Sequence, residues 1–168
     1  KDEAHITVIS GDKDLLQILN PTTRIAFTKK GYTEYDIYTE QRFLDEYGIA
    51  PLQFTDVKAF MGDTSDGYPG VKGIGPKTAL QLIQAYGSID GVLDALHTLK
   101  PAQRKKIEEN LEMLLLSRQL AAIDMQQPIE VDIDALQLSP YSHSTFEQLD
   151  DVGYRLISKH ARSIYSLI

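Results

Sequence analysis

The short β-branched run Ile6-Thr7-Val8-Ile9 constrains the fold of this chain more than any other feature. Ser10, Gly11 and Asp12 follow it directly, and residues 14–19 then have the apolar spacing of a helix. This order predicts a strand, a tight turn and a helix. A strand without alternating polar residues is typical of a parallel sheet that is covered on both faces. Nothing earlier in the chain supplies neighbours for this strand, so we expect an α/β arrangement that is either a fragment or built on a very small sheet.

The pattern changes from α/β to helical near residue 50. Two short strands are predicted at residues 24–28 and 34–38, followed by a helix that Thr39 caps and Gly48 ends. After Pro51 the apolar residues are spaced as on helices. The predicted helices cover residues 54–61 and 76–86, and a third short helix follows the capping residue Ser88.

A long helix is predicted to begin at Pro101. Its buried face is expected to hold Ile107, Leu111, Leu114 and Leu115. Beyond Pro128 the pattern is weaker: residues 129–133 alternate as in a strand, and two short helices are predicted after Ser144.

The formal net charge of -7 argues at first against a nucleic-acid partner, but the charges are unevenly distributed. Residues 119–154 hold seven acids and no Lys or Arg, whereas residues 71–106 hold six Lys and Arg against two acids. A basic region on an acidic chain is typical of a nucleic-acid surface. The longest aliphatic run, residues 113–116, is far shorter than the roughly 18 apolar residues of a spanning helix, so no membrane role is expected. Because the chain has no cysteine, a metal would need oxygen or histidine ligands.

Carboxylates occur in two predicted turns. Asp12 and Asp14 lie at the carboxyl end of the first strand, where open α/β sheets place their sites. Asp63 and Asp66 lie in a loop rich in Gly and Pro. Taken singly, Asp12 is equally well explained as a helix cap and the loop acids as turn formers. Taken together, the four acids favour a hard cation such as Mg²⁺ or Mn²⁺.

A glycine-rich stretch, GVKGIGPKT at residues 70–78, comes close to a phosphate-binding P-loop. Pro76 interrupts that motif and no strand leads into it, so a P-loop is not expected. A hairpin between two helices fits better, since its amides and the next helix N-terminus can approach a phosphate flanked by Lys72 and Lys77. A simple helix connector with solvated lysines is the alternative. The basic run at residues 100–106 is compatible with a DNA-backbone surface or with a plain solvated face.

These motifs resemble the structure-specific 5′ nuclease family, most closely the 5′ to 3′ exonuclease domain of bacterial DNA polymerase I. The residues that carry the resemblance are SGDKDLLQ at 10–17 and GDTSDGYPGVKGIGPKTA at 62–79. The resemblance implies an α/β fold: the C-terminal part of a PIN-like nuclease core, then a mainly helical DNA-binding region with a helix-hairpin-helix. We place these parts at residues 1–50 and 51–121, and we expect residues 122–168 to pack back on the core.

The resemblance also implies a 5′ to 3′ exonuclease and flap endonuclease that hydrolyses DNA phosphodiesters by two-metal catalysis with Mg²⁺ or Mn²⁺. In that family pattern Asp12, Asp14 and Asp66 correspond to ligands of the second metal, and Asp63 is an additional acid. The backbone of Val71 and Ile74 is implied to hold a monovalent cation, usually K⁺, at the hairpin. The DNA-binding residues implied are Lys72, Gly73, Gly75, Lys77, Thr78, Arg104 and Lys105.

Two departures from the family pattern bear on function. Gly67 stands where the bacterial pattern has Asn, which is expected to loosen that turn. The N-terminal half of the family is not matched, so we expect an incomplete C-terminal portion with weak or no activity alone. Its expected partners are that N-terminal half, DNA with a 5′ end or flap, and a polymerase domain in the parent chain, in the bacterial cytoplasm with the nucleoid. The alternative functions are a non-catalytic module that binds duplex DNA and a protein-interaction domain that uses the acidic segment.

Overall fold

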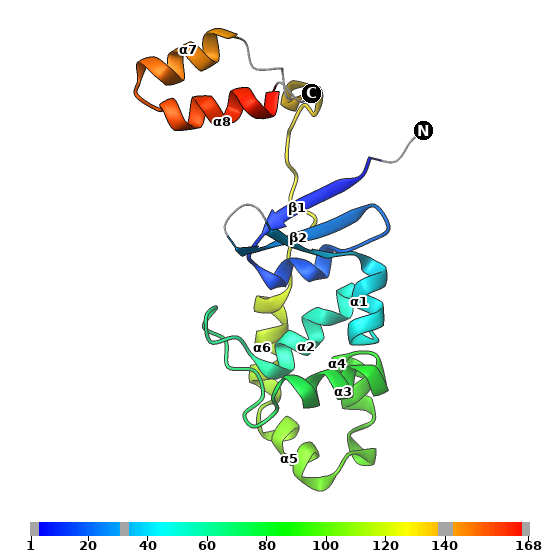
Figure 1. Ribbon diagram of the computed structural model, residues 1–168. Coiled ribbons are helices and arrows are strands. Elements are labelled where there is room, and N and C mark those ends of the chain that lie inside the picture. Colours follow the sequence, from blue (N-terminus) through cyan, green and yellow to red (C-terminus); the bar gives the residue numbers. More distant parts are fainter. Residues whose placement is uncertain (1–3, 31–33, 138–142, 166–168) are drawn as a thin grey trace. The chain divides into compact units, whose positions relative to one another are not determined.

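The computed structural model describes residues 4–30, 34–137 and 143–165 of the chain (Figure 1). The chain forms two compact units, Lys1–Met125 and Gln126–Ile168. No helix in the described part of the chain is both long enough and apolar enough to cross a membrane. The first unit carries all the candidate site residues.

A three-stranded sheet of order β1-β2-β3 opens the first unit. β1 (Ile6–Ser10) pairs in parallel with β2 (Thr23–Lys30), and β2 pairs antiparallel with β3 (Glu34–Tyr38). The predicted strands and the parallel pairing are confirmed. The sheet is very small, which was one of the two alternatives: within the described residues β1 is the edge strand of three and exposes 60% of Ile9.

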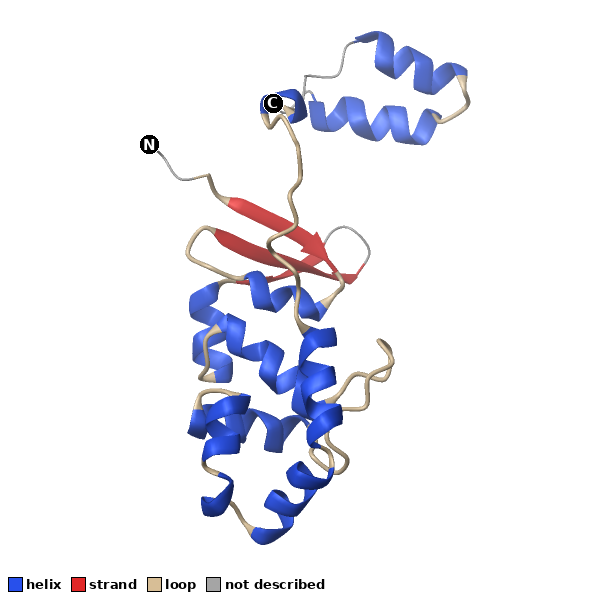
Figure 2. Cartoon of the chain, turned by 180° about the vertical axis from the view of Figure 1, so that it is seen from behind, coloured by secondary structure: helices blue, strands red, loops and turns tan. Residues whose placement is uncertain are grey.

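The helices of the first unit gather on one side of this sheet (Figure 2). α1 begins after Thr39, whose hydroxyl accepts a hydrogen bond from the Arg42 amide at 3.2 Å, and it ends at the left-handed Gly48, as predicted. Phe43, Phe60 and Ile25 are fully buried and form the centre of the core between sheet and helices. The helical elements are η1 (Lys13–Ile18), α1 (Glu40–Tyr47), η2 (Pro51–Gln53), α2 (Phe54–Met61), α3 (Pro76–Tyr86), α4 (Ile89–Asp94), η3 (Leu96–Thr98), α5 (Pro101–Glu109) and α6 (Leu111–Ala121).

The single long helix predicted from Pro101 is wrong, because the chain breaks at Asn110 into α5 and α6. The Asn110 side chain donates a 2.8 Å hydrogen bond to the Lys106 carbonyl, and its own backbone leaves the helical region. Such local side-chain bonds compete with a continuous helix. Ile107 and Leu114 are buried as predicted, whereas two residues predicted for the same face, Leu111 and Leu115, are about 40% exposed.

The second unit contains a helical hairpin of α7 (His143–Asp151) and α8 (Arg155–Tyr165). The two helices predicted after Ser144 are therefore confirmed. Phe146 and Ser158 are buried between them, and the Ser158 hydroxyl donates to the Phe146 carbonyl at 3.3 Å. The predicted strand at residues 129–133 is wrong, since no strand of the described chain pairs with it and its side chains are exposed. The predicted return of residues 122–168 onto the core stays a prediction, and part of that segment, 138–142 and 166–168, lies outside the described residues.

A buried carboxylate, Asp56, ties three helices of the first unit together. It accepts hydrogen bonds from the Ile89 amide and from Arg118 Nε, each at 2.9 Å, and Arg118 also contacts Asp90. We expect Asp56→Ala to lower the free energy of unfolding by on the order of 3 kcal/mol, because it leaves a buried amide and a guanidinium without their acceptor. Urea denaturation measures the change, with the exposed Asp45→Ala as control, expected to shift stability by less than about 0.5 kcal/mol. Equal effects of the two substitutions would contradict this role of Asp56.

Candidate functional site

The turn after β1 places the first two predicted acids. The Ser10 hydroxyl accepts a hydrogen bond from the Asp12 amide at 3.1 Å, and Asp12 Oδ1 accepts one from the Asp14 amide at 2.9 Å. Asp12 therefore caps η1, as its simpler interpretation predicted, and this leaves Asp14 in the first turn. A role of Asp12 in binding metal stays a prediction.

The loop that carries the other two acids is closed by paired backbone hydrogen bonds. The amides of Asp63 and Tyr68 each donate to the other residue's carbonyl, at 2.8 and 3.1 Å. Below this pair the backbones of Gly62 and Gly70 touch: a Cβ atom on Gly70, whose φ is 63°, would lie 2.3 Å from the Gly62 nitrogen. Only glycine fits such a contact in this conformation, so the sequence GDTSDGYPG builds a loop with a fixed stem.

Asp14, Asp63 and Asp66 come together although they lie in two segments far apart in the sequence. One carboxylate oxygen from each residue lies within 4.8 Å of the others. Asp14 and Asp63 are half-buried, and Asp66 is exposed. Asp12 is not a member of this group. Three predicted acids thus form the carboxylate cluster, and Asp12 lies beside it as the cap of the turn.

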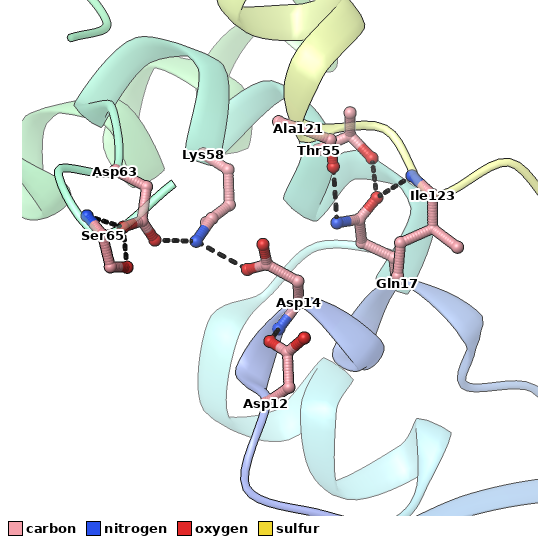
Figure 3. A network of polar contacts seen from close by, with 9 residues as sticks. All are labelled: Asp12, Asp14, Gln17, Thr55, Lys58, Asp63, Ser65, Ala121 and Ile123. Carbon is pink, nitrogen blue, oxygen red and sulfur yellow. Dashed lines mark hydrogen bonds and ion pairs between the residues drawn. The ribbon is translucent and has the colours of Figure 1, made fainter. Parts of the chain in front are cut away.

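Lys58 on α2 is a site residue that the sequence analysis missed. Its ammonium group lies between the two segments, 2.5 Å from Asp14 Oδ1 and in contact with Asp63 Oδ2 (Figure 3). Only 6% of the Lys58 side chain is exposed. A signal was available in the sequence, since Lys58 lies four residues after the buried Phe54, on the apolar face of the helix.

The charges in the cluster shift each other's pKa values. Burial raises the pKa of Asp14, even though Lys58 opposes the shift. Hydrogen bonds from Lys58 and then from Ser65 hold the pKa of Asp63 below its usual range. Burial alone would lower the pKa of Lys58, but its bonds to Asp14 and Asp63 outweigh burial and raise it. The cluster therefore holds an ammonium ion against carboxylates in the absence of any other cation.

Tyr68 adds a buried polar atom to this region. Its side chain is 2% exposed, and its hydroxyl has no hydrogen-bond partner within the described residues. Burial raises the pKa of Tyr68, and the charges of Lys58 and Asp14 also act on it. A buried hydroxyl without a partner costs free energy, so Tyr68 places a destabilised polar group beside the cluster.

Gln17 anchors the acid-bearing turn to the helices. Its buried amide donates to the Ala121 carbonyl at 2.9 Å, and its oxygen accepts from the Thr55 hydroxyl at 2.6 Å (Figure 3). These bonds join η1 to α2 and to the end of α6. The position of Asp14 relative to Lys58 is therefore fixed by side-chain contacts between distant segments as well as by the turn itself.

The predicted hairpin is present between α3 and the loop of residues 62–70, called here the acid loop. Val71 and Ile74 are buried and anchor it, the Ile74 amide donates to the Val71 carbonyl at 3.0 Å, and Gly73 has a φ of 82° at its tip. Lys72 and Lys77 are exposed and form no ion pair with a carboxylate in the described chain. Two sets of assignments stay predictions: DNA contacts for Lys72, Gly73, Gly75, Lys77 and Thr78, and cation binding by the backbone of Val71 and Ile74.

The basic run on α5 divides into two kinds of residue. Arg104 pairs with Glu108 at 2.7 Å and Lys105 with Glu109 at 3.7 Å, both on the exposed surface of the helix. Lys106, which the sequence analysis did not select, instead donates to the Gly73 carbonyl of the hairpin at 2.9 Å. DNA contacts of Arg104 and Lys105 stay predictions.

The chain is similar to known proteins both in sequence and in fold. Residues 49–144 match the family model described as 5′-3′ exonuclease, C-terminal SAM fold. The 5′-3′ exonuclease of Bacillus subtilis (strain 168) is 46% identical over 136 residues, which cover 80% of this chain and 46% of that protein. DNA polymerase I of Lactococcus lactis subsp. lactis (strain IL1403) is 39% identical over 154 residues, covering 89% of this chain and 17% of that protein.

A similar solved structure is that of T5 5′-exonuclease with bound divalent metal ions (zinc). It has a TM-score of 0.56 and 26% sequence identity, and the match covers 70% of this chain and 42% of that one. The chain thus spans less than half the length of each of these three relatives.

Proposed function

Because this chain belongs to the 5′-3′ exonuclease family, we propose that its carboxylate cluster and hairpin serve the hydrolysis of DNA at 5′ ends and flaps. One observation carries the proposal: Asp14, Asp63 and Asp66 are brought within 4.8 Å of one another from two segments. The family consists of metal-dependent nucleases, and a relative was solved with divalent metal ions bound.

The residues of the cluster fit a divalent cation. Carboxylate oxygens are the ligands that Mg²⁺ and Mn²⁺ prefer, and three residues each offer one within 4.8 Å of the others. Asp14, Asp63 and Asp66 would hold the ion, with Asp12 fixing the turn that carries Asp14. When bound, such ions supply a hydroxide near neutral pH and neutralise charge on the leaving oxygen.

Two-metal catalysis requires more carboxylates than this cluster offers. Of its three acids, Asp14 and Asp63 already contact Lys58. We therefore propose that polypeptide beyond these 168 residues supplies the remaining ligands, in line with a relative of which the chain covers 46%. A polymerase domain in the same parent chain is proposed from the similarity to DNA polymerase I.

The hairpin and α5 would bind the DNA backbone. Lys72 and Lys77 offer ammonium groups, and the amides of Gly73 and Gly75 with the Thr78 hydroxyl can donate to phosphate oxygens. Arg104 and Lys105 extend this surface, and the backbone of Val71 and Ile74 would hold a K⁺ ion against a phosphate. Because all these groups address the backbone, binding should depend strongly on salt and little on base sequence.

A labelled 5′-flap duplex tests the proposal. The chain is incubated with it in Mg²⁺ or in EDTA, and cleavage and gel shift are read from the same samples. We expect a salt-sensitive gel shift with little cleavage. In thermal denaturation we expect Mg²⁺ to stabilise the chain, and Asp66→Asn to remove this stabilisation.

Metal-dependent cleavage by the chain alone would support the nuclease assignment and would show that no ligands from outside the chain are needed. A shift without any stabilisation by metal would favour a non-catalytic module that binds duplex DNA. A chain that neither shifts the duplex at moderate salt nor responds to metal would contradict the proposal.

A further inference from the structure

We propose that Lys106 is a positioning residue of the hairpin: its ammonium group holds the Gly73 carbonyl and thereby sets the backbone that meets DNA. The inference rests on the proposed function for its DNA partner. The contact joins residues 33 positions apart, from α5 to the tip of the hairpin, at a distance of 2.9 Å.

The local structure on both sides favours this contact. On α5 the neighbouring Ile107 is fully buried, and the Asn110 side chain binds the Lys106 carbonyl at 2.8 Å, so the backbone of Lys106 is fixed. On the hairpin, Gly73 has no Cβ; one built there would lie 2.8 Å from the Lys106 ammonium nitrogen. The glycine thus leaves space for the side chain that approaches it.

Lys106 differs in its ion pairing from its neighbours on α5. Arg104 and Lys105 are already paired with glutamates of their own helix. Lys106, like Lys72 and Lys77, forms no ion pair with a carboxylate among the described residues. Its positive charge is therefore not neutralised and remains available to a polyanion near the hairpin.

The bond has a direct consequence for a phosphate at the hairpin. A free carbonyl oxygen at the tip would repel phosphate oxygens, whereas a carbonyl bound to an ammonium group presents net positive charge. Held in this way, the loop needs less ordering when DNA binds, which lowers the entropic cost of association. Lys106 would act through the conformation of the loop as well as through its charge.

The test compares Lys106→Met with Lys105→Met, which removes the same charge from the adjacent position. Lys29→Met removes the same charge from β2, far from the hairpin in sequence, and is the control that should leave the hairpin unchanged. In the DNA-free chain, hydrogen exchange of the Ile74 amide is measured by NMR. We expect exchange to be about tenfold faster in Lys106→Met, because local opening becomes easier, and unchanged in the other two variants. Lys106→Arg, which keeps a donor and the charge, should restore most of the protection.

Binding of a 5′-flap duplex is then followed by fluorescence anisotropy over a range of KCl concentrations. A variant that loses one phosphate contact should show a salt dependence, the slope of log affinity against log salt, that is less steep by about 0.9. At every salt concentration Lys106→Met should bind the duplex several-fold more weakly than Lys105→Met. Equal Ile74 exchange in Lys106→Met and Lys105→Met would overturn the inference. If the unmodified chain binds no duplex while exchange changes as expected, the proposed DNA function fails and the positioning of the hairpin by Lys106 stands.

Discussion

Lys58→Met is expected to lower the free energy of unfolding of the metal-free chain by on the order of 3 kcal/mol, and divalent cations should restore much of this loss. The substitution removes a buried ammonium group and leaves the carboxylates of Asp14 and Asp63 facing each other without a cation between them. In the unmodified chain a metal ion must displace that ammonium group. In the variant it meets three carboxylates with no competing ammonium group, so Mn²⁺ should stabilise the variant more than the unmodified chain.

Urea denaturation in EDTA and in Mn²⁺ measures both effects. Because the pKa of Lys58 is raised, the stability it contributes is fully present below its ordinary pKa of 10.5 and is lost only as the pH rises through the higher folded value. The loss of stability caused by Lys58→Met should therefore be the same at any pH near neutrality. Lys29→Met, which removes an exposed lysine paired at 3.8 Å, is the control and should change little. If Lys58→Met were as stable as the unmodified chain in EDTA, the bridging role of Lys58 would be wrong.

Gly70→Ala is expected to disrupt the acid loop. The added Cβ would lie 2.3 Å from the Gly62 nitrogen and 2.6 Å from the Phe60 carbonyl oxygen, and neither backbone atom can move without opening the loop. The left-handed φ of 63° adds a further penalty for a residue with a side chain. We expect a loss of about 4 kcal/mol in stability, from overpacking together with backbone strain. Stabilisation by Mn²⁺ should disappear as well.

Gly67→Ala is the matched control for this substitution. Gly67 lies in the same loop with a φ of 79°, but a Cβ there meets nothing within 4 Å. Its cost should be the backbone penalty alone, about 1–2 kcal/mol, with metal binding retained. Thermal denaturation with and without Mn²⁺ compares the two variants. Similar losses in both would show that the close approach of the two glycine backbones is not what holds the loop.

Features of the fold that depend on residues adjacent in the sequence could be predicted from the sequence. The strand and turn at Ile6–Ser10, the cap at Thr39, the stop at Gly48 and the helix that begins at Pro76 all follow from local rules. The predicted long helix failed at Asn110 because its side chain binds the preceding turn, and apolar spacing carries no information on that bond.

The candidate site was predicted in its acids and its hairpin but not in the residues that hold them in place. Asp14, Asp63 and Asp66 were selected from residue type and turn context, and the structure brings them together. Lys58 and Lys106 were missed because each acts through a contact with a distant segment. Their roles depend on tertiary packing, which places a lysine from α2 or α5 against the loop that needs it.

Binding of Mn²⁺ to the chain tests the central claim most directly. Free Mn²⁺ is measured by electron paramagnetic resonance during titration of the unmodified chain, of Asp66→Asn and of Asp94→Asn, a carboxylate on α4 outside the cluster. We predict saturable binding whose affinity falls by about tenfold or more in Asp66→Asn and is unchanged in Asp94→Asn. Loss of a residue that only hydrogen-bonds to a metal ligand already costs about tenfold in affinity, and loss of a ligand itself should cost no less. Equal binding by all three proteins, or none by the unmodified chain, would contradict a metal centre formed by Asp14, Asp63 and Asp66.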